Sequence, residues 1–377
     1  MRVLIPIGSF FPDQSGGPSN SLYWLAKALT KNGISVEIVT TNRGIKNLPL
    51  NQRLSTEYGK VIYCKTKFHY LPILMLLNVF KLINKVDIIL LTSIFYPPSW
   101  IIAFIIVFFK KKIIWSARGE LYEEALVYGS WKKKPFVFFF KYLIPSKLIF
   151  HTTCREESDI IRKVLGNAVN LIEIPNMLEL PSIEVRDCKE KYFLYVGRID
   201  PDKALINLIN GFTKSQVFNA SNLVFKIAGN ANNSYGRRLK KIVTENGLQE
   251  KVKFIGHIEG REKQKLYVNS HFTFLISYGE NFGNVVIESL AQGTPVVASH
   301  GVPWQQLEEK GAGFWIENSP AEIAAVIDRI INLTDDEYAE YRKNALSLVQ
   351  TEYDINKNID RWIEALNLVY SSKTIAN

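Results

Sequence analysis

The chain has 377 residues, of which 47% are hydrophobic and 22% are charged, a balance typical of a globular protein that excludes a disordered or low-complexity chain. This length allows two domains, each burying its own core. The net charge of +10 is uneven: residues 1–175 carry 23 Lys/Arg against 11 Asp/Glu, a net charge of +12, and residues 176–377 carry 23 against 25, a net charge of −2. A solvated surface explains the basic half as well as an anionic partner does, whether a phosphate-bearing acceptor, a membrane surface or nucleic acid.

The spacing of the cysteines and the length of the apolar stretches indicate where in the cell the protein is expected. The three cysteines, Cys64, Cys154 and Cys188, are far apart and form no CxxC pair, which favours a reducing compartment over a disulfide framework or a zinc site. Residues 1–7 are too short for the apolar region of a signal peptide. Leu71–Phe80 and Trp100–Phe109 are each about half of the ~20 residues that span a bilayer, so they indicate buried or interfacial segments. We expect a cytoplasmic protein, soluble or peripheral on the inner face of the cell membrane.

The first 45 residues predict the unit of a parallel sheet. An apolar strand over Arg2–Ile7 is followed by a loop at Gly8–Gly17 and a helix over Pro18–Lys31 with leucines at helical spacing. Pro18 suits the first helical turn, and a β-branched strand follows at Ser35–Thr40. Strand, helix and strand in this order are typical of an α/β fold.

The same alternation continues along the chain and restarts in its second half. Further strands are predicted at Val86–Leu91, Ile113–Ser116, Leu148–His151, Tyr192–Val196, Leu223–Ala228, Lys253–Ile255, Phe272–Ile276 and Pro295–Ala298. A polar connector at Pro175–Asp187 separates the two series, and an amphipathic helix is expected over Ile355–Tyr370. We therefore predict domains at residues 1–178 and 188–352, with a C-terminal helix in residues 353–377 that packs back on the first domain.

The segment from Glu280 to Glu288 carries the strongest functional signal. It predicts a strand, a glycine-bearing turn and a helix that begins near Asn284 and ends at Gly293. The unpaired amides of a helix N-terminus can bind phosphates or sugar hydroxyls, and Gly283 allows close approach to the backbone. As isolated residues, the two glutamates would be a surface pair beside an ordinary turn.

The complete string, E-x-F-G-x-x-x-x-E followed by G-x-P-V-V-A-S, resembles the E-x7-E signature of family-four retaining glycosyltransferases. The resemblance implies the GT-B fold, two Rossmann-like domains facing each other across a cleft, with the first binding the acceptor and the second the nucleotide-sugar donor. It implies that Glu280 orients the sugar and that Glu288 binds the ribose. It also places the donor against Asn281, Phe282, Gly283, Asn284 and Val285.

A second segment, Val196 to Lys203, follows the first strand of the second domain. It resembles the family pattern G-R-x-x-x-x-K, which implies that Arg198 and Lys203 hold the donor diphosphate. Two cations at the switch point of an α/β sheet can also stabilise a charged leaving group on physical grounds alone. Ala204 departs from the glycine that is usual in the family. We interpret Asp200-Pro201-Asp202 as a turn, and we expect neither a metal nor any cofactor besides the UDP- or GDP-sugar substrate.

Two segments of the first domain extend the resemblance. Gly16 and Gly17 open the first helix, as a family loop over the donor phosphates does, although a flexible loop with a helix cap fits equally well. Ser116 to Glu120 resembles a family segment in which many members have His where this chain has Arg118. Arginine stays protonated and cannot act as a base, so Arg118 would hydrogen-bond sugar or phosphate. His151 is expected in the core rather than as a ligand.

Lys132, Lys133 and Lys134 are flanked by aromatic residues, which fits a core helix with a basic edge, a membrane-surface helix or, least well, a nucleic-acid surface. The whole pattern predicts a metal-independent, retaining hexosyltransferase acting on a glycan or a polyprenyl-diphosphate-linked acceptor in bacterial surface polysaccharide assembly, such as O-antigen or capsule. An anionic membrane is a predicted partner, and nucleic acid is not. Two alternatives remain: a GT-B sugar-nucleotide epimerase, and a non-catalytic protein that binds sugar nucleotides or polyanions.

Overall fold

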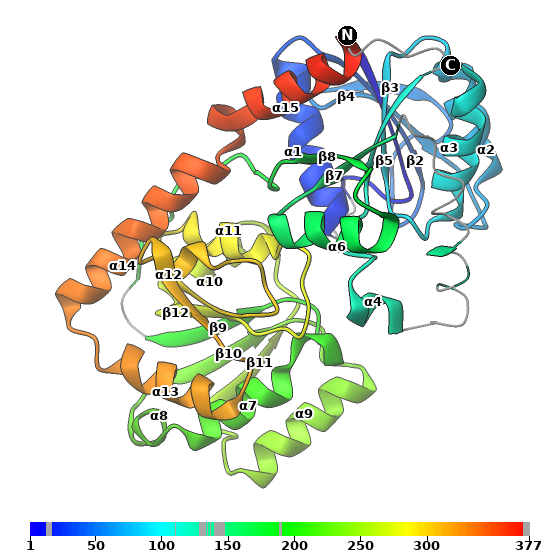
Figure 1. Ribbon diagram of the computed structural model, residues 1–377. Coiled ribbons are helices and arrows are strands. Elements are labelled where there is room, and N and C mark those ends of the chain that lie inside the picture. Colours follow the sequence, from blue (N-terminus) through cyan, green and yellow to red (C-terminus); the bar gives the residue numbers. More distant parts are fainter. Residues whose placement is uncertain are drawn as a thin grey trace. The chain divides into compact units, whose positions relative to one another are not determined.

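The computed structural model describes residues 1–12, 17–109, 111–127, 133, 135, 137, 138, 148–187 and 191–371. The chain forms two compact units, Met1–Glu179 with Ile355–Asn377, and Leu180–Asp354. Each unit is built on its own β-sheet with helices against it, as the predicted α/β fold requires (Figure 1). Within the described parts of the chain, no helix combines the length and the apolar character that a membrane crossing requires.

The first unit contains an eight-stranded sheet in the order β3-β4-β2-β1-β5-β6-β7-β8, parallel except for the β3–β4 pair. Its strands are β1 (Arg2–Ile7), β2 (Ser35–Thr41), β3 (Arg53–Thr56), β4 (Gly59–Cys64), β5 (Ile88–Thr92), β6 (Lys112–Ser116), β7 (Ile149–Thr152) and β8 (Asn170–Glu173). Its helices are α1 (Gly17–Lys31), α2 (Ile73–Ile83), α3 (Pro97–Phe109), α4 (Glu123–Val127), α6 (Arg155–Leu165) and α15 (Ile355–Ser371).

The sheet of the first unit is buried on both faces. Val3 and Ile5 on β1 lie in one core, which α1 and α15 cover, and Leu4 lies in a second core under α2 and α3. Such two-sided burial explains why the parallel strands are continuous apolar runs. The C-terminal helix α15 belongs to this unit and packs against α1 (Figure 1).

The second unit contains a six-stranded parallel sheet in the order β11-β10-β9-β12-β13-β14. Its strands are β9 (Tyr192–Val196), β10 (Val224–Ala228), β11 (Val252–Gly256), β12 (Phe272–Leu275), β13 (Val296–Ser299) and β14 (Gly313–Ile316). Its helices are α7 (Leu205–Lys214), α8 (Gln216–Ala220), α9 (Ser234–Glu245), α10 (Gly260–Asn269), α11 (Asn284–Leu290), α12 (Gln306–Glu309), α13 (Pro320–Ile331) and α14 (Asp335–Leu348), with a 3-10 turn at Pro201–Lys203 and a π turn at Val349–Tyr353.

In the second sheet, β10 and β11 follow on one side of β9, and β12, β13 and β14 follow on its other side, so the strand order reverses between β9 and β12. Ligands of open α/β sheets bind outside the carboxyl ends of the strands at such a switch point. The loops that follow β9 and β12 are the ones that carry Arg198, Lys203 and Glu280. The fold therefore positions both sequence motifs at the place where a nucleotide is expected.

Candidate active site

The loop after β9 is built from a glycine, a short 3-10 turn and a left-handed residue. A Cβ at Gly197 would lie 2.8 Å from the Tyr195 hydroxyl, so a side chain there would have to displace the buried Tyr195, whose hydroxyl donates to the Arg198 carbonyl. Ala204, where the family usually has glycine, has φ 44° and ψ 29°. The left-handed geometry is thus kept despite the methyl group, at a cost of about 1 kcal/mol. Ala204 therefore adds backbone strain at this point of the loop.

The two predicted phosphate-binding cations both lie in ion pairs. Arg198 Nη1 lies 2.6 Å from Asp200 Oδ2, and Arg198 Nη2 lies 3.7 Å from Asp202 Oδ2. Lys203 is almost buried, and its Nζ lies 2.5 Å from Glu280 Oε2 and 3.4 Å from Asp202 Oδ2. Three carboxylates therefore surround two cations, which leaves one net negative charge. The sequence motifs did not indicate this competition for the cations.

Two contacts hold the loop after β12 against the loop after β9. Ser277 Oγ donates a hydrogen bond to the Asp202 carbonyl at 2.9 Å, and the Tyr278 amide donates to the same carbonyl at 3.0 Å. The Glu280 amide donates to the Gly301 carbonyl at 2.8 Å. These hydrogen bonds hold the two loops that carry Lys203 and Glu280 next to each other.

The turn before α11 is shaped by Gly283, which has φ 81° and caps the helix. Its Cβ, if it had one, would lie 2.6 Å from Leu275 Cδ2. Phe282 is buried, packs edge-to-face on Trp304, and accepts the Trp304 Nε1 hydrogen bond on its carbonyl. Its side chain is a packing group, so a donor contact at residue 282 would use the backbone amide. Helix α11 ends at Leu290, three residues before the predicted Gly293.

Asn281, Asn284 and Val285, the remaining predicted donor contacts of this turn, are all half-buried. Asn284 is the first residue of α11 and follows Gly283 directly. The turn therefore places these three residues next to the glycine cap, and their contact with a donor stays a prediction.

Glu288 is held by two residues of α10 that the sequence analysis did not single out. Lys263 Nζ lies 3.0 Å from Glu288 Oε1, and the Tyr267 hydroxyl donates to Oε2 at 3.0 Å. Burial first, and then the Glu288 charge, raise the pKa of Tyr267 well above its usual range, so the phenol remains a donor. A carboxylate has about four lone-pair sites, which leaves acceptor capacity for a ribose hydroxyl. Both partners lie one helix upstream, and no spacing rule links them to Glu288.

Arg118 lies at the carboxyl end of β6 in the first unit, at φ 57°. Its Nη1 donates to Asn176 Oδ1 at 2.7 Å, and its Nε is buried without a hydrogen-bond partner. Among the described residues no carboxylate forms an ion pair with it. Burial lowers the pKa of Arg118 to about 10, while Glu157 opposes that shift, so the side chain remains a cation at neutral pH. Its unused donors suit an anion or a sugar.

The remaining first-unit predictions have separate outcomes. Gly17 is the first residue of α1, and Gly16 lies outside the described residues. His151 is in the core as expected: its ring lies 2.7 Å from the Ser116 hydroxyl and 2.9 Å from the Ile174 carbonyl. Burial, and then the Arg118 charge, lower the pKa of His151 to about 3, which makes it unsuitable as a base at neutral pH.

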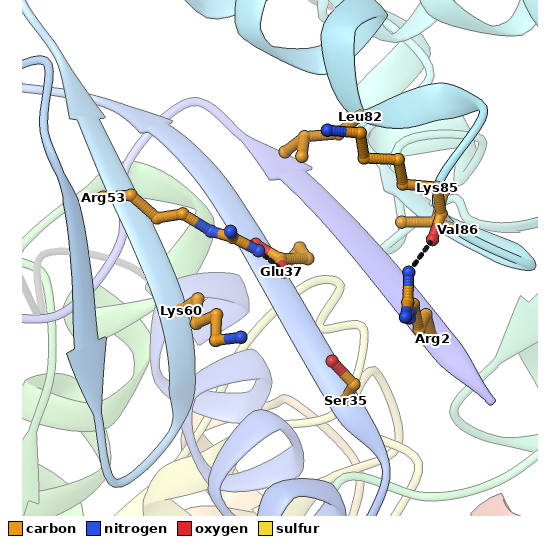
Figure 2. Close-up of a pocket in the computed structure, with 8 residues that line it drawn as sticks. All are labelled: Arg2, Ser35, Glu37, Arg53, Lys60, Leu82, Lys85 and Val86. Carbon is orange, nitrogen blue, oxygen red and sulfur yellow. Dashed lines mark hydrogen bonds and ion pairs between the residues drawn. The ribbon is translucent and has the colours of Figure 1, made fainter.

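A cavity in the first unit lies away from these strand ends (Figure 2). It is lined by Arg2 and Ser35, the first residues of β1 and β2, and by Arg53, which pairs with the buried Glu37. The cavity therefore lies at the amino ends of the strands. Its volume of about 230 Å³ is also below the ~300–1,000 Å³ that is usual for ligand pockets, and none of the predicted donor-binding residues lines it.

The Asp200-Pro201-Asp202 segment forms ion pairs with Arg198 and Lys203, in agreement with its interpretation as part of the loop. Over the described ranges, no cluster of three or more His, Cys, Asp or Glu side chains has the arrangement of a metal site.

Two α/β units, each built on a largely parallel sheet, have the architecture of the GT-B fold. A solved structure supports this class: sucrose-phosphate synthase from Thermosynechococcus elongatus matches with a TM-score of 0.82 and 18% identity, covering 99% of this chain and 100% of that one. Residues 178–348 match the family model of the glycosyl transferases group 1. The family resemblance is thereby confirmed, while the roles of the E-x7-E residues stay predictions.

Curated relatives match over part of their length. An uncharacterized glycosyltransferase of Methanocaldococcus jannaschii is 33% identical over 166 residues, which cover 43% of this chain and 40% of that protein. The O-antigen chain mannosyltransferase of Salmonella typhimurium is 27% identical over 147 residues, covering 39% of this chain and 40% of that protein. The chain thus aligns with about two fifths of the length of these two relatives.

Proposed function

We propose that the chain is a retaining, metal-independent glycosyltransferase. In this proposal it moves a hexose from a UDP- or GDP-sugar to a glycan or a polyprenyl-diphosphate-linked acceptor at the inner face of the cell membrane, in surface polysaccharide assembly. The observation that carries the proposal is the Lys203–Glu280 pair at the switch point of the second sheet. The match of residues 178–348 to the family model and the similarity to an O-antigen chain mannosyltransferase support the same reaction class.

The donor diphosphate would bind by exchange of charge partners. Arg198 is largely exposed and can turn from Asp200 towards a phosphate, whereas Lys203 is almost buried and can only share its ammonium. Charge-assisted hydrogen bonds to phosphate then replace those to carboxylate at little net cost. Arg198 and Lys203 would stabilise the leaving diphosphate, which is why the proposal needs no metal ion.

The sugar and the ribose would lie on opposite sides of the Gly283 turn. Glu280 would accept hydrogen bonds from sugar hydroxyls through the oxygen that Lys203 does not bind. Glu288, fixed by Lys263 and Tyr267, would accept from the ribose hydroxyls. The half-buried Asn281, Asn284 and Val285, together with the backbone amide of residue 282, complete the donor contacts in this proposal.

The chemistry follows from these positions. The acceptor hydroxyl attacks the anomeric carbon from the face that the nucleotide leaves, the bond from that carbon to the phosphate oxygen breaks, and a phosphate oxygen takes the hydroxyl proton. No enzyme carboxylate is required as a nucleophile. The acceptor would bind to the basic first unit, where Arg118 and, as the resemblance implies, the Gly16–Gly17 loop would donate to sugar or phosphate.

A melting screen of the wild-type protein with UDP, GDP, ADP and their sugars tests the donor assignment. A nucleotide present at 100 times its dissociation constant adds about 2.7 kcal/mol to the free energy of unfolding. We expect one base to stabilise the protein far more than the others, and more strongly as its sugar conjugate. If every nucleotide leaves the melting temperature unchanged, the proposal fails.

Product analysis separates the proposal from its two alternatives. A transferase consumes the stabilising nucleotide-sugar only when an acceptor, such as a lipid-diphosphate glycan, is present. An epimerase converts the sugar with the donor alone. A binding protein shows a melting shift and no turnover with either mixture.

A further inference from the structure

Helix α2 and the residues before it expose an unusual number of apolar side chains. Six of them have 43% to 75% of their surface exposed: Phe68, Tyr70, Leu71, Ile73, Leu74 and Leu77. We call these six residues the α2 face. Isolated exposed apolar residues are ordinary, but a contiguous set of large ones marks an interaction surface.

The α2 face is not a result of loose packing. Met75, Leu76 and Val79 on the opposite side of the same helix are buried in the core of the first unit. The outward positions Ile73, Leu77 and Lys81 follow helical spacing, where a water-facing helix would be polar. The helix is therefore fixed in place, with an apolar stripe directed outward.

The neighbouring helix α3 continues the same surface. It packs against α2 (Figure 1), and its sequence from Pro97 to Phe109 contains no charged residue. Phe104 on α3 is 67% exposed. The packed pair of helices therefore exposes apolar side chains from both α2 and α3.

We propose that the α2 face docks onto the surface of an anionic lipid bilayer. An 11-residue helix is about 16 Å long, about half of the ~30 Å hydrocarbon core. It can lie in the interface with Phe68, Tyr70 and Leu71 inserted among the acyl chains. The proposal deepens the membrane location within the proposed function, and it does not require that glycosyl transfer be correct.

The positive charge around the α2 face favours an anionic bilayer over another binding partner. Between Glu57 and Glu120 the chain carries nine Lys/Arg and a single acidic residue, Asp87. Three of these cations, Lys65, Lys67 and Lys81, are exposed on or beside the helix. A second copy that docked through the same face would bring the same positive charge to the contact and be repelled, whereas anionic headgroups attract it.

This surface differs from the one that the sequence indicated. Of Lys132, Lys133 and Lys134, only Lys133 lies within the described residues, and its ammonium donates to the Ala125 carbonyl at 2.6 Å and lies 5.0 Å from the centre of the Phe95 ring. That cation is engaged within the protein. Lys132 and Lys134 lie outside the described residues, so their contact with a membrane stays a prediction and the docking is argued from α2.

Flotation of the full chain with vesicles of equal parts phosphatidylcholine and phosphatidylglycerol tests the docking. We expect salt-sensitive binding that is lost with pure phosphatidylcholine. The double variant Ile73→Gln/Leu77→Gln should lower the partition coefficient about tenfold or more. Changing Lys65, Lys67 and Lys81 to Gln should lower it about fivefold per lysine. Leu368→Gln, which changes an exposed leucine on α15, is the matched control and should bind like the wild type.

Three outcomes overturn the proposal: a wild type that stays unbound, a double variant that floats as well as the wild type, or equal losses in the double variant and the control. Light scattering of the free protein adds a fourth, self-association that the double variant abolishes, since a second copy would then cover the face. The nucleotide melting shift is measured on the same samples. Vesicle binding without that shift rejects the donor assignment alone, and the shift without vesicle binding rejects only the docking.

Discussion

Lys203 Nζ lies 2.5 Å from Glu280 Oε2, although 77 positions separate the two residues in the chain. The ammonium is almost buried, and the carboxylate still reaches water. Together with Asp202, the pair links the loop after β9 to the loop after β12. Because Lys203 is shared between carboxylates and the proposed phosphate, its replacement and that of Glu280 should have opposite effects.

Lys203→Ala removes the cation. We expect the nucleotide that stabilises the wild type to bind about 10- to 100-fold more weakly, the equivalent of one lost charge-assisted hydrogen bond of about 1.5–3 kcal/mol. Titration calorimetry measures the change. Lys253→Ala, which breaks an exposed pair with Glu250, is the control and should leave affinity unchanged. Equal affinities in all three proteins would remove Lys203 from the site.

Glu280→Gln removes one of three carboxylates around two cations. We expect the nucleoside diphosphate alone to bind at least as tightly as it does to the wild type, because its phosphates no longer compete with Glu280. The additional affinity of the sugar conjugate should fall, since Glu280 would orient the sugar. Comparing both ligands on both proteins by calorimetry checks this. A variant that loses diphosphate affinity would contradict the charge argument.

Tyr267→Phe removes the hydroxyl that donates to Glu288 Oε2 and keeps the ring in the core. The carboxylate then loses one fixed contact, about 1 kcal/mol, and we expect nucleotide affinity to fall by about two- to tenfold. The control is Tyr192→Phe, which loses a hydrogen bond to the Leu266 carbonyl on the same helix. Weaker binding in both variants to the same extent would indicate general destabilisation of α10.

Much of the fold could be predicted from the sequence because buried parallel strands are continuous apolar runs. The strands at Arg2–Ile7 and Tyr192–Val196 match the prediction residue for residue. The β3–β4 pair and β14 were not predicted. β3 is a short edge strand with polar residues and alternating exposure, so it has no apolar run, and β14 has only three apolar residues after its first glycine, a run too short to mark a strand by itself.

The site could be predicted only as far as its motifs extend. Arg198, Lys203 and Glu280 stand in recognisable strings, and the structure brings Lys203 and Glu280 together. Lys263 and Tyr267 belong to no string, because their link to Glu288 depends on how α10 packs beside α11. The ion pairs of Arg198 and Lys203 with carboxylates could not be predicted either, because they depend on side-chain rotamers and loop conformations rather than on spacing in the sequence.

Gly283→Ala places a side chain at φ 81°, with its Cβ 2.6 Å from Leu275 Cδ2. We expect the free energy of unfolding to fall by about 2–4 kcal/mol, from about 1 kcal/mol of backbone strain and the rest from overpacking. Gly247→Ala is the matched control, with φ 66° and open space around the new methyl group, so it isolates the backbone cost. Urea unfolding measures both; equal losses would show that the turn adapts.

Because His151 is buried as a neutral ring, we expect the first unit to lose stability as the pH falls. Its pKa in the folded state is about 3, because burial and then Arg118 disfavour the charged ring, whereas in the unfolded chain it is near 6.5. Below pH 6.5 the unfolded chain therefore binds a proton that the folded chain excludes. The stabilisation is complete at neutral pH and is lost as the pH falls towards 3, by about 2 kcal/mol at pH 5.

His151→Gln should remove that contribution. Urea unfolding of both proteins at pH 7 and pH 5 gives the measurement, and the stability difference between them should shrink by about 2 kcal/mol at the lower pH. His271, whose pKa burial lowers to about 4, is present in both proteins and cancels in the comparison. If both proteins lose stability in parallel, the ring is not excluded from protonation, and the buried contacts with Ser116 and the Ile174 carbonyl do not hold it neutral.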